Sequence, residues 1–140
     1  MALNWCYNEP WKTAANNSII SYPAQPKKAY FAVRDALRAT MPSAKFPKFV
    51  YRAGECFSAE LWLLNDSAET VDEEVTADIE IAGNSVCIGH WKSGNVESFS
   101  NRRGECVSFT LPRCETDRFT LVLHTEHGNM SRYTLRYLWE

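Results

Sequence analysis

The sequence lacks several features that define common classes of protein. Within its 140 residues, no apolar run reaches the roughly 18 residues of a membrane span, so we expect no membrane partner. The net charge is −2, and Lys and Arg form no basic block. Because nucleic acids are bound by clustered cations, we expect no nucleic-acid partner either. What remains is the composition of an ordinary globular domain, with 45% hydrophobic residues.

A recognisable signal peptide is also missing. The first residues, Met1-Ala2-Leu3-Asn4-Trp5, contain no basic segment followed by an apolar one. On this ground we favour a cytoplasmic location. If the chain is a fragment, however, the missing signal says nothing about the export of its parent protein.

The cysteines do not form a disulfide framework. They are five in number, widely spaced, and include no Cys-x-x-Cys pair: Cys6, Cys56, Cys87, Cys106 and Cys114. An odd count of this kind favours free thiols in a reducing compartment, and we expect most of them to be buried.

Two short spacings could suit a metal ion. These are Cys87-x-x-His90 and His124-x-x-His127. A structural zinc site needs four ligands in recognisable pairs, and the chain offers no such set. We therefore predict neither a metal nor a cofactor, and assign these residues a structural or surface role.

The N-terminal part of the chain predicts one helix, at residues 27–38. Tyr30, Val33 and Leu37 recur at helical spacing and give a single apolar stripe. Pro26 suits the first helical position, and Pro42 marks the end of the segment. The stripe needs cover, so we expect the helix to dock on the rest of the chain or on a second copy of it.

From residue 46 onward the pattern changes to strict alternation. Apolar and polar residues alternate in several short segments separated by Gly, Asn and Asp turns. The predicted strands are residues 57–63, 75–81, 107–111, 119–123 and 133–139, with weaker strands at 48–52 and 86–92. About seven short strands with one apolar face each require two packed sheets. We predict an immunoglobulin-like antiparallel β-sandwich over residues 42–140, preceded by a strand-loop-helix tail over residues 1–41.

The tail carries a family resemblance. Residues 4–11 (NWCYNEPW), 18–22 (SIISY) and 26–33 (PKKAYFAV) resemble, in this order, the end of the catalytic (β/α)8 barrel of glycoside hydrolase family 2. That family contains β-mannosidases, β-galactosidases and β-glucuronidases, and its β-mannosidase-type members continue directly into a C-terminal β-sandwich. Family members often have Asp where this chain has Glu9, which leaves the subfamily open.

The resemblance implies that the chemistry lies outside this chain. Glycosidases of this kind use two carboxylates, and in this family both lie on earlier barrel strands, upstream of residue 1. We therefore expect no catalytic residue here. Trp5 matches the aromatic floor beneath the sugar, and Asn8 lies at the same strand end, so both are candidate substrate contacts in the parent. The parent would be a retaining β-glycosidase, with a β-mannosidase favoured, and the barrel and its carbohydrate substrate would be the partners.

Trp62 and Trp91 offer a second interpretation. Trp62 lies opposite the apolar face of its predicted strand, so its ring is either covered by a neighbouring domain or free to hold a ligand. The first case predicts an accessory domain that docks on the barrel. The second predicts a carbohydrate-binding module that binds glycans without cleaving them. A sandwich of unrelated origin that binds proteins is a third possibility, which leaves residues 4–33 unexplained.

Overall fold

The structure, a computed structural model, describes residues 6–13 and 17–140. The chain divides into two compact units, Met1–Arg38 (unit 1) and Ala39–Glu140 (unit 2). The sequence placed this division after residue 41. The difference arises because residues that were assigned to the tail belong to the first strand of the sandwich. No helix in the described part of the chain has the length and apolar character that a membrane crossing requires.

Unit 1 contains a small hairpin and a helix. Strands β1 (Ile20–Ser21) and β2 (Gln25–Pro26) pair antiparallel, and helix α1 (Lys28–Ala36) follows at once. Pro26 ends β2 instead of opening the helix, and Lys27 takes the N-cap position. Leu37 closes the helix by donating its N–H to Val33 O and Arg34 O. None of the nine residues of α1 is buried.

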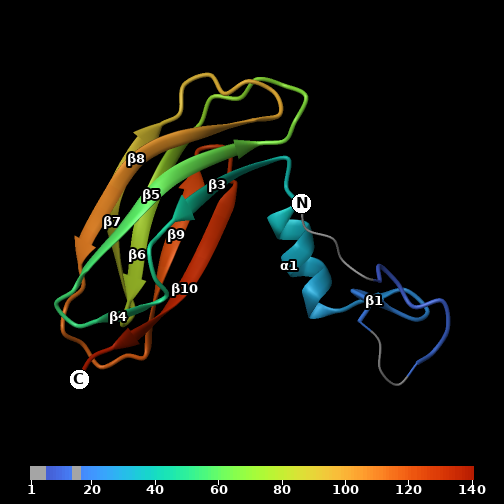
Figure 1. Ribbon diagram of the computed structural model, residues 1–140, viewed down its shortest axis with the longest axis horizontal. Coiled ribbons are helices and arrows are strands. Elements are labelled where there is room, and N and C mark those ends of the chain that lie inside the picture. The colour runs from blue at the N-terminus through green and yellow to red at the C-terminus, as the bar shows by residue number, and fades with distance from the viewer. Residues whose placement is uncertain (1–5, 14–16) are drawn as a thin grey trace. The chain divides into compact units, whose positions relative to one another are not determined.

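Unit 2 is a β-sandwich, which confirms the predicted fold class. A five-stranded sheet has the order β4-β10-β9-β6-β7 and a three-stranded sheet the order β3-β5-β8. Figure 1 shows β5 and β8 crossing in front of β6 and β7. The strands are β3 (Thr40–Lys45), β4 (Val50–Arg52), β5 (Cys56–Asn65), β6 (Glu74–Ile81), β7 (Asn84–Lys92), β8 (Ser100–Thr110), β9 (Arg118–Thr125) and β10 (Met130–Leu138). All pairs are antiparallel except β4 with β10.

The core of unit 2 follows from the alternation in β5, β6 and β9. Their inward residues are almost completely buried between the two sheets. At one end, the rings of Tyr51, Phe57 and Phe119 meet edge to face, with centroids 5.4–5.6 Å apart. Aromatic rings favour this arrangement because a positive ring edge meets a negative ring face.

Strand β3 is the element that the sequence analysis missed. It pairs with β5 in the register Pro42 with Leu63, and it forms an edge of its sheet. Proline has no N–H for a sheet ladder, so Pro42 predicts the end of a segment and not a strand. On an edge strand the missing N–H can face away from the neighbouring strand, so proline is tolerated there.

A buried amide organises the loops at one end of unit 2. The Asn65 side chain is completely buried, and its Nδ2 donates to Glu69 O (2.8 Å), Glu97 O (3.0 Å) and Val96 O (3.1 Å). Its Oδ1 accepts hydrogen bonds from the N–H (3.1 Å) and hydroxyl (2.6 Å) of Ser67. One side chain thus ties together the β5–β6 and β7–β8 connections.

The five thiols are free, as predicted, but they are not buried. Cys56, Cys87 and Cys106 are exposed, while Cys6 and Cys114 are half-buried. The three exposed cysteines occupy outward positions of β5, β7 and β8, which the alternation of those strands turns toward solvent.

Candidate functional site

The first candidate site lies in unit 1, where two chain segments run side by side. Asn8 forms an isolated parallel bridge with Ile20. Glu9 N–H donates to Ile20 O (3.0 Å), and Ile20 N–H donates to Tyr7 O (3.0 Å). These bonds fix residues 7–9 against the start of the hairpin. Asn8, a predicted substrate contact, therefore sits in the bridge with its residue exposed. Trp5, the other predicted contact, lies outside the described residues.

A buried carboxylate holds this site together. Glu9 is 8% exposed, and its Oε1 accepts from Lys27 Nζ (2.7 Å) and Ser18 Oγ (3.0 Å), while Oε2 accepts from Tyr22 N–H (3.2 Å). The hydrogen bond from Lys27, and then that from Tyr22, hold the pKa of Glu9 below its ordinary value. The carboxylate is thus ionised and engaged by three donors.

This arrangement suits a structural role for Glu9 better than proton transfer. A general acid needs a raised pKa and a proton to give, whereas the pKa of Glu9 is lowered. Residues 1–38 contain only one other acid, Asp35, which is exposed on α1 and ion-paired with Arg34 (2.7 Å). Unit 1 therefore lacks the pair of facing carboxylates that a glycosidase requires.

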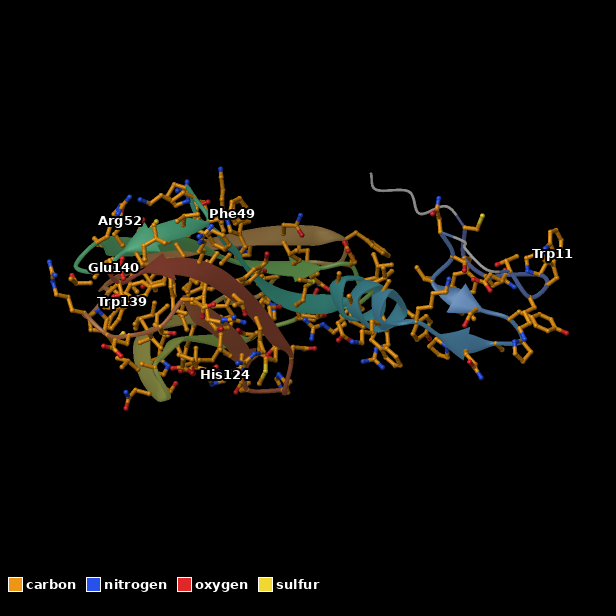
Figure 2. All side chains as sticks on the ribbon, turned by 90° about the horizontal axis from the view of Figure 1, so that it is seen from below. Trp11, Phe49, Arg52, His124, Trp139 and Glu140 are labelled. Atoms are coloured by element: carbon orange, nitrogen blue, oxygen red, sulfur yellow. The ribbon has the colours of Figure 1, made fainter. Side chains whose placement is uncertain are left out.

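Exposed aromatic rings lie in the chain segments that form the Glu9 network. Tyr7 is 62%, Trp11 66% and Tyr22 50% exposed. Figure 2 shows the Trp11 side chain at the far end of the unit 1 loop, directed away from it. Large exposed rings on a small structured loop suit contact with a sugar face or with a neighbouring protein surface. Among the described residues of unit 1, these rings are the groups best placed for binding.

The second candidate site is the outer face of the three-stranded sheet. Trp62 on β5 is half-buried, and its Nε1–H donates to Glu60 Oε1 (2.8 Å). Glu60 also forms an ion pair with Arg103 on β8. Beside them is a shallow groove of about 320 Å³, lined mainly by apolar atoms and including Phe46, Glu60 and Cys106. The hydrogen bond to Glu60 thus fixes the Trp62 indole on the outer face, next to this apolar groove.

Trp91 does not belong to such a platform. It is 9% exposed and packs in the core, where a Cβ on Gly104 would lie 2.6 Å from its Cδ2. The cause is a β-bulge in β7. Gly89 pairs with Ala77 and Cys87 with Asp78, so Ile88 is an extra residue. The bulge shifts the alternation by one residue and turns Trp91 inward.

The histidines of the predicted His124-x-x-His127 spacing face different partners. His124 Nδ1 lies 3.4 Å from Asp78 Oδ2, and His127 Nδ1 lies 3.0 Å from Glu73 Oε2. Glu73 raises the pKa of His127, mainly through this hydrogen bond. Glu126 completes a group of three potential metal ligands with Glu73 and His127, whose ligand atoms all lie within 4.8 Å of one another. Spacing in the sequence pointed to His127 but could not indicate Glu73 as its partner, because Glu73 lies 54 residues before His127.

Comparisons with known proteins locate the fold. No protein-family model matches the chain, and no curated protein matches it. Among solved structures, Spo0M, a sporulation control protein from Bacillus subtilis, is similar with a TM-score of 0.51 and 10% identity, over 73% of this chain and 50% of that chain. A β-glucosidase from Listeria innocua in complex with glucose has a TM-score of 0.50 and 10% identity, over 71% of this chain and 16% of the enzyme.

A third similar structure is a complete small domain. The CARDB domain of a Pyrococcus furiosus protein, in complex with di-metal ions, has a TM-score of 0.50 and 12% identity, over 72% of this chain and 94% of that domain. The chain therefore spans half of Spo0M and a small part of the glycosidase. At these identities the likeness shows a β-sandwich fold and nothing beyond the fold.

Proposed function

We propose that this chain is the C-terminal part of a family 2 glycoside hydrolase, in which unit 2 is a non-catalytic accessory domain. Unit 1 would then be the end of the catalytic barrel, and the carboxylates of the reaction would lie upstream of residue 1. The parent would hydrolyse β-glycosidic bonds with retention, with a β-mannosidase favoured.

The observation that carries this proposal is the uncovered apolar surface of unit 1. Helix α1 buries none of its residues; Phe31 is 46% and Leu37 78% exposed. Tyr7 and Trp11, in the segment that precedes the β1–β2 hairpin, are exposed as well. A segment whose described residues form an ordered ion-pair network and bury a single apolar side chain, Ile19, needs a larger body to pack against. An upstream barrel would supply that body, in agreement with the sequence resemblance of residues 4–33.

The similar structures are compatible with an accessory role. The β-glucosidase segment that this chain matches is 16% of a long enzyme chain, so a sandwich of this kind can be one part of a glycosidase. This is support at the level of the fold only, and the family assignment rests on the sequence resemblance.

The test compares the 140-residue chain with a longer product of the same gene that includes the upstream region. Both are assayed on a panel of aryl β-glycosides. We expect hydrolysis by the long product alone, and the best substrate would identify the sugar. Enzyme-like turnover by the 140-residue chain would overturn the proposal. In the long product, Leu37→Asp at the C-cap of α1 should lower the stability of the barrel, whereas Lys28→Asp, at an exposed polar position of the same helix, should not.

A glycan-binding module is the second candidate, favoured by Trp62. The Glu60 and Arg103 side chains support its ring on the outer sheet face, beside the groove at Phe46. Titration of the chain with soluble mannan or cello-oligosaccharides, followed by calorimetry, separates the two functions. Binding that is lost in Trp62→Ala and kept in Trp11→Ala would favour the module. If binding is lost only in Trp11→Ala, the sugar contact belongs to unit 1 and the accessory-domain proposal is favoured.

A further inference from the structure

A cysteine, a histidine and a threonine form a hydrogen-bonded row on the outer face of the five-stranded sheet. Cys87 Sγ lies 3.2 Å from His90 Nε2, and His90 Nδ1 lies 3.1 Å from Thr76 Oγ1. Cys87 and His90 are exposed, and β7, which carries both, is an edge strand. The thiol can therefore be reached from solvent while it touches an imidazole.

The β-bulge at Ile88 creates this contact. Residues three apart on a regular strand point to opposite faces, so Cys87 and His90 should not meet. The extra residue puts both on the outer face, where Cys87 pairs with Asp78 and His90 with Thr76. Gly89 allows the bulge to lie close to the other sheet, because a Cβ at this position would be 2.5 Å from Val107 Cγ1. Bulges often re-aim side chains at functional sites.

The geometry favours transfer of the thiol hydrogen to His90. In the tautomer with its hydrogen on Nδ1, His90 donates to the Thr76 hydroxyl and leaves Nε2 as an acceptor for the Cys87 thiol. Cys87 Sγ also lies 3.8 Å from Gly89 O, a longer contact than that to His90. A nucleophile, a base and a group that orients the base are the three parts of an activated thiol.

We propose that Cys87 is a site of reversible S-thiolation by low-molecular-mass disulfides, with His90 as the base and Thr76 as the positioning residue. His90 Nε2 accepts the thiol proton as Cys87 Sγ attacks one sulfur of the disulfide. The S–S bond of the reagent breaks, and the leaving thiolate takes the proton from His90. Cys87 is oxidised to a mixed disulfide, the reagent is reduced to one thiol, and excess thiol reverses the exchange. This proposal does not depend on the function proposed above.

The chain contains matched control thiols. Cys56 on β5 and Cys106 on β8 are exposed like Cys87. Among the hydrogen bonds of the described residues, none joins either of these thiols to an imidazole, and the other two histidines, His124 and His127, contact Asp78 and Glu73. The Asp78 carboxylate faces Cys87 across β6 and β7, and its Oδ2 lies 3.4 Å from His124 Nδ1.

The first experiment measures single-cysteine variants in which the other four cysteines are Ser. Each is reacted with dithiobis-nitrobenzoate, an aromatic disulfide that releases a coloured thiol, and with oxidised glutathione. We expect the Cys87-only variant to react about tenfold faster than the Cys56-only and Cys106-only variants, since His90 can take the thiol proton as the sulfur attacks. Equal rates for the three variants would overturn the proposal.

The second experiment tests the role of His90 in the Cys87-only variant. His90→Gln should lower the rate to about that of Cys56, and Thr76→Val should lower it by less. His127→Gln, which removes an imidazole elsewhere, should leave the rate unchanged. An unchanged rate in His90→Gln contradicts the assignment of the base.

The unmodified chain provides a check that requires no substitution. With less than one equivalent of oxidised glutathione, peptide mass spectrometry should find glutathione first on Cys87. A first addition on Cys56 or Cys106 would also overturn the proposal.

Discussion

The two units of this chain are held together by different kinds of interaction. Unit 2 packs apolar side chains from two sheets into a continuous core. In the described part of unit 1, the buried residues are Glu9, Ser18 and one apolar side chain, Ile19. The charged network of unit 1 fixes the local chain path, but it removes little apolar surface from water. Burial of apolar surface is the main source of folding free energy. The described residues of unit 1 therefore bury far less apolar surface than those of unit 2.

The strongest test of this contrast is the same truncation in each unit. Phe57, which is fully buried, contacts the rings of Tyr51 and Phe119. We expect Phe57→Ala to lower the free energy of unfolding of unit 2 by about 3–5 kcal/mol, because it leaves a cavity. Phe31→Ala on α1 should change the stability by less than about 1 kcal/mol. Chemical denaturation followed by tryptophan fluorescence measures both, and similar losses would contradict the contrast.

A polar group inside unit 2 provides the next test. Asn65→Ala leaves the carbonyls of Glu69, Val96 and Glu97 without their shared donor. Each carbonyl keeps a second donor, from Ser67, Val71 or Ser100. We still expect a loss of about 2–3 kcal/mol, because the substitution removes several buried hydrogen bonds at once. Asn65→Asp replaces the donor by an oxygen that repels the three carbonyls, and it should be at least as destabilising. A neutral effect of Asn65→Asp would mean that the amide orientation is not what holds the loops.

The close packing of the two sheets gives a smaller effect. A Cβ on Gly104 would lie 2.6 Å from the Trp91 ring, so we expect Gly104→Ala to cost about 1–3 kcal/mol through overpacking. Adding Trp91→Phe should recover part of this loss, because the smaller ring leaves room for the methyl group. If the stability lost in the double variant equals or exceeds the summed losses of the two single variants, crowding by Trp91 is not the cause.

The smallest expected effect concerns the charge network of unit 1. The pKa of Glu9 is lowered, so its contribution to stability is present above the pKa of an unfolded Glu and is lost as pH falls through the lower, folded value. An NMR titration of the Glu9 carboxylate should show an inflection below 4.5, the ordinary value. Lys27→Met should move it upward. An unmoved inflection would assign the shift to Ser18 and Tyr22 instead.

The sequence predicted the sandwich well because alternation is a local property. In β5 and β6 every second residue is buried, as the pattern of residues 57–63 and 75–81 required. The sequence-based prediction failed where one residue shifted the alternation of a strand, or where a proline lay inside a strand and not at its end. The extra Ile88 turned Trp91 inward and brought Cys87 to His90, and Pro42 concealed an edge strand. Register shifts depend on the neighbouring strand and cannot be read from one segment alone.

The candidate sites were less predictable than the fold. Asn8 and Trp11 lie in segments that the family resemblance pointed out, but the partners of Glu9 do not follow from spacing. Ser18 and Lys27 lie 9 and 18 residues further along the chain, and only the folded loop brings them to one carboxylate. Trp62 pointed to the outer face of β5. Arg103, which lies opposite Trp62 on β8 and forms an ion pair with Glu60, could not be assigned to this face from the sequence.

Pro42 also affects how this protein behaves at high concentration. An edge strand offers unpaired backbone groups to other chains, and this is how sheets add strands to one another during aggregation. Because Pro42 cannot donate a hydrogen bond, an incoming strand would lack a rung in the middle of β3. The residue that hid the strand from sequence analysis would thus act as a safeguard for solubility, one that protects the sandwich whenever its edge is not covered by another domain.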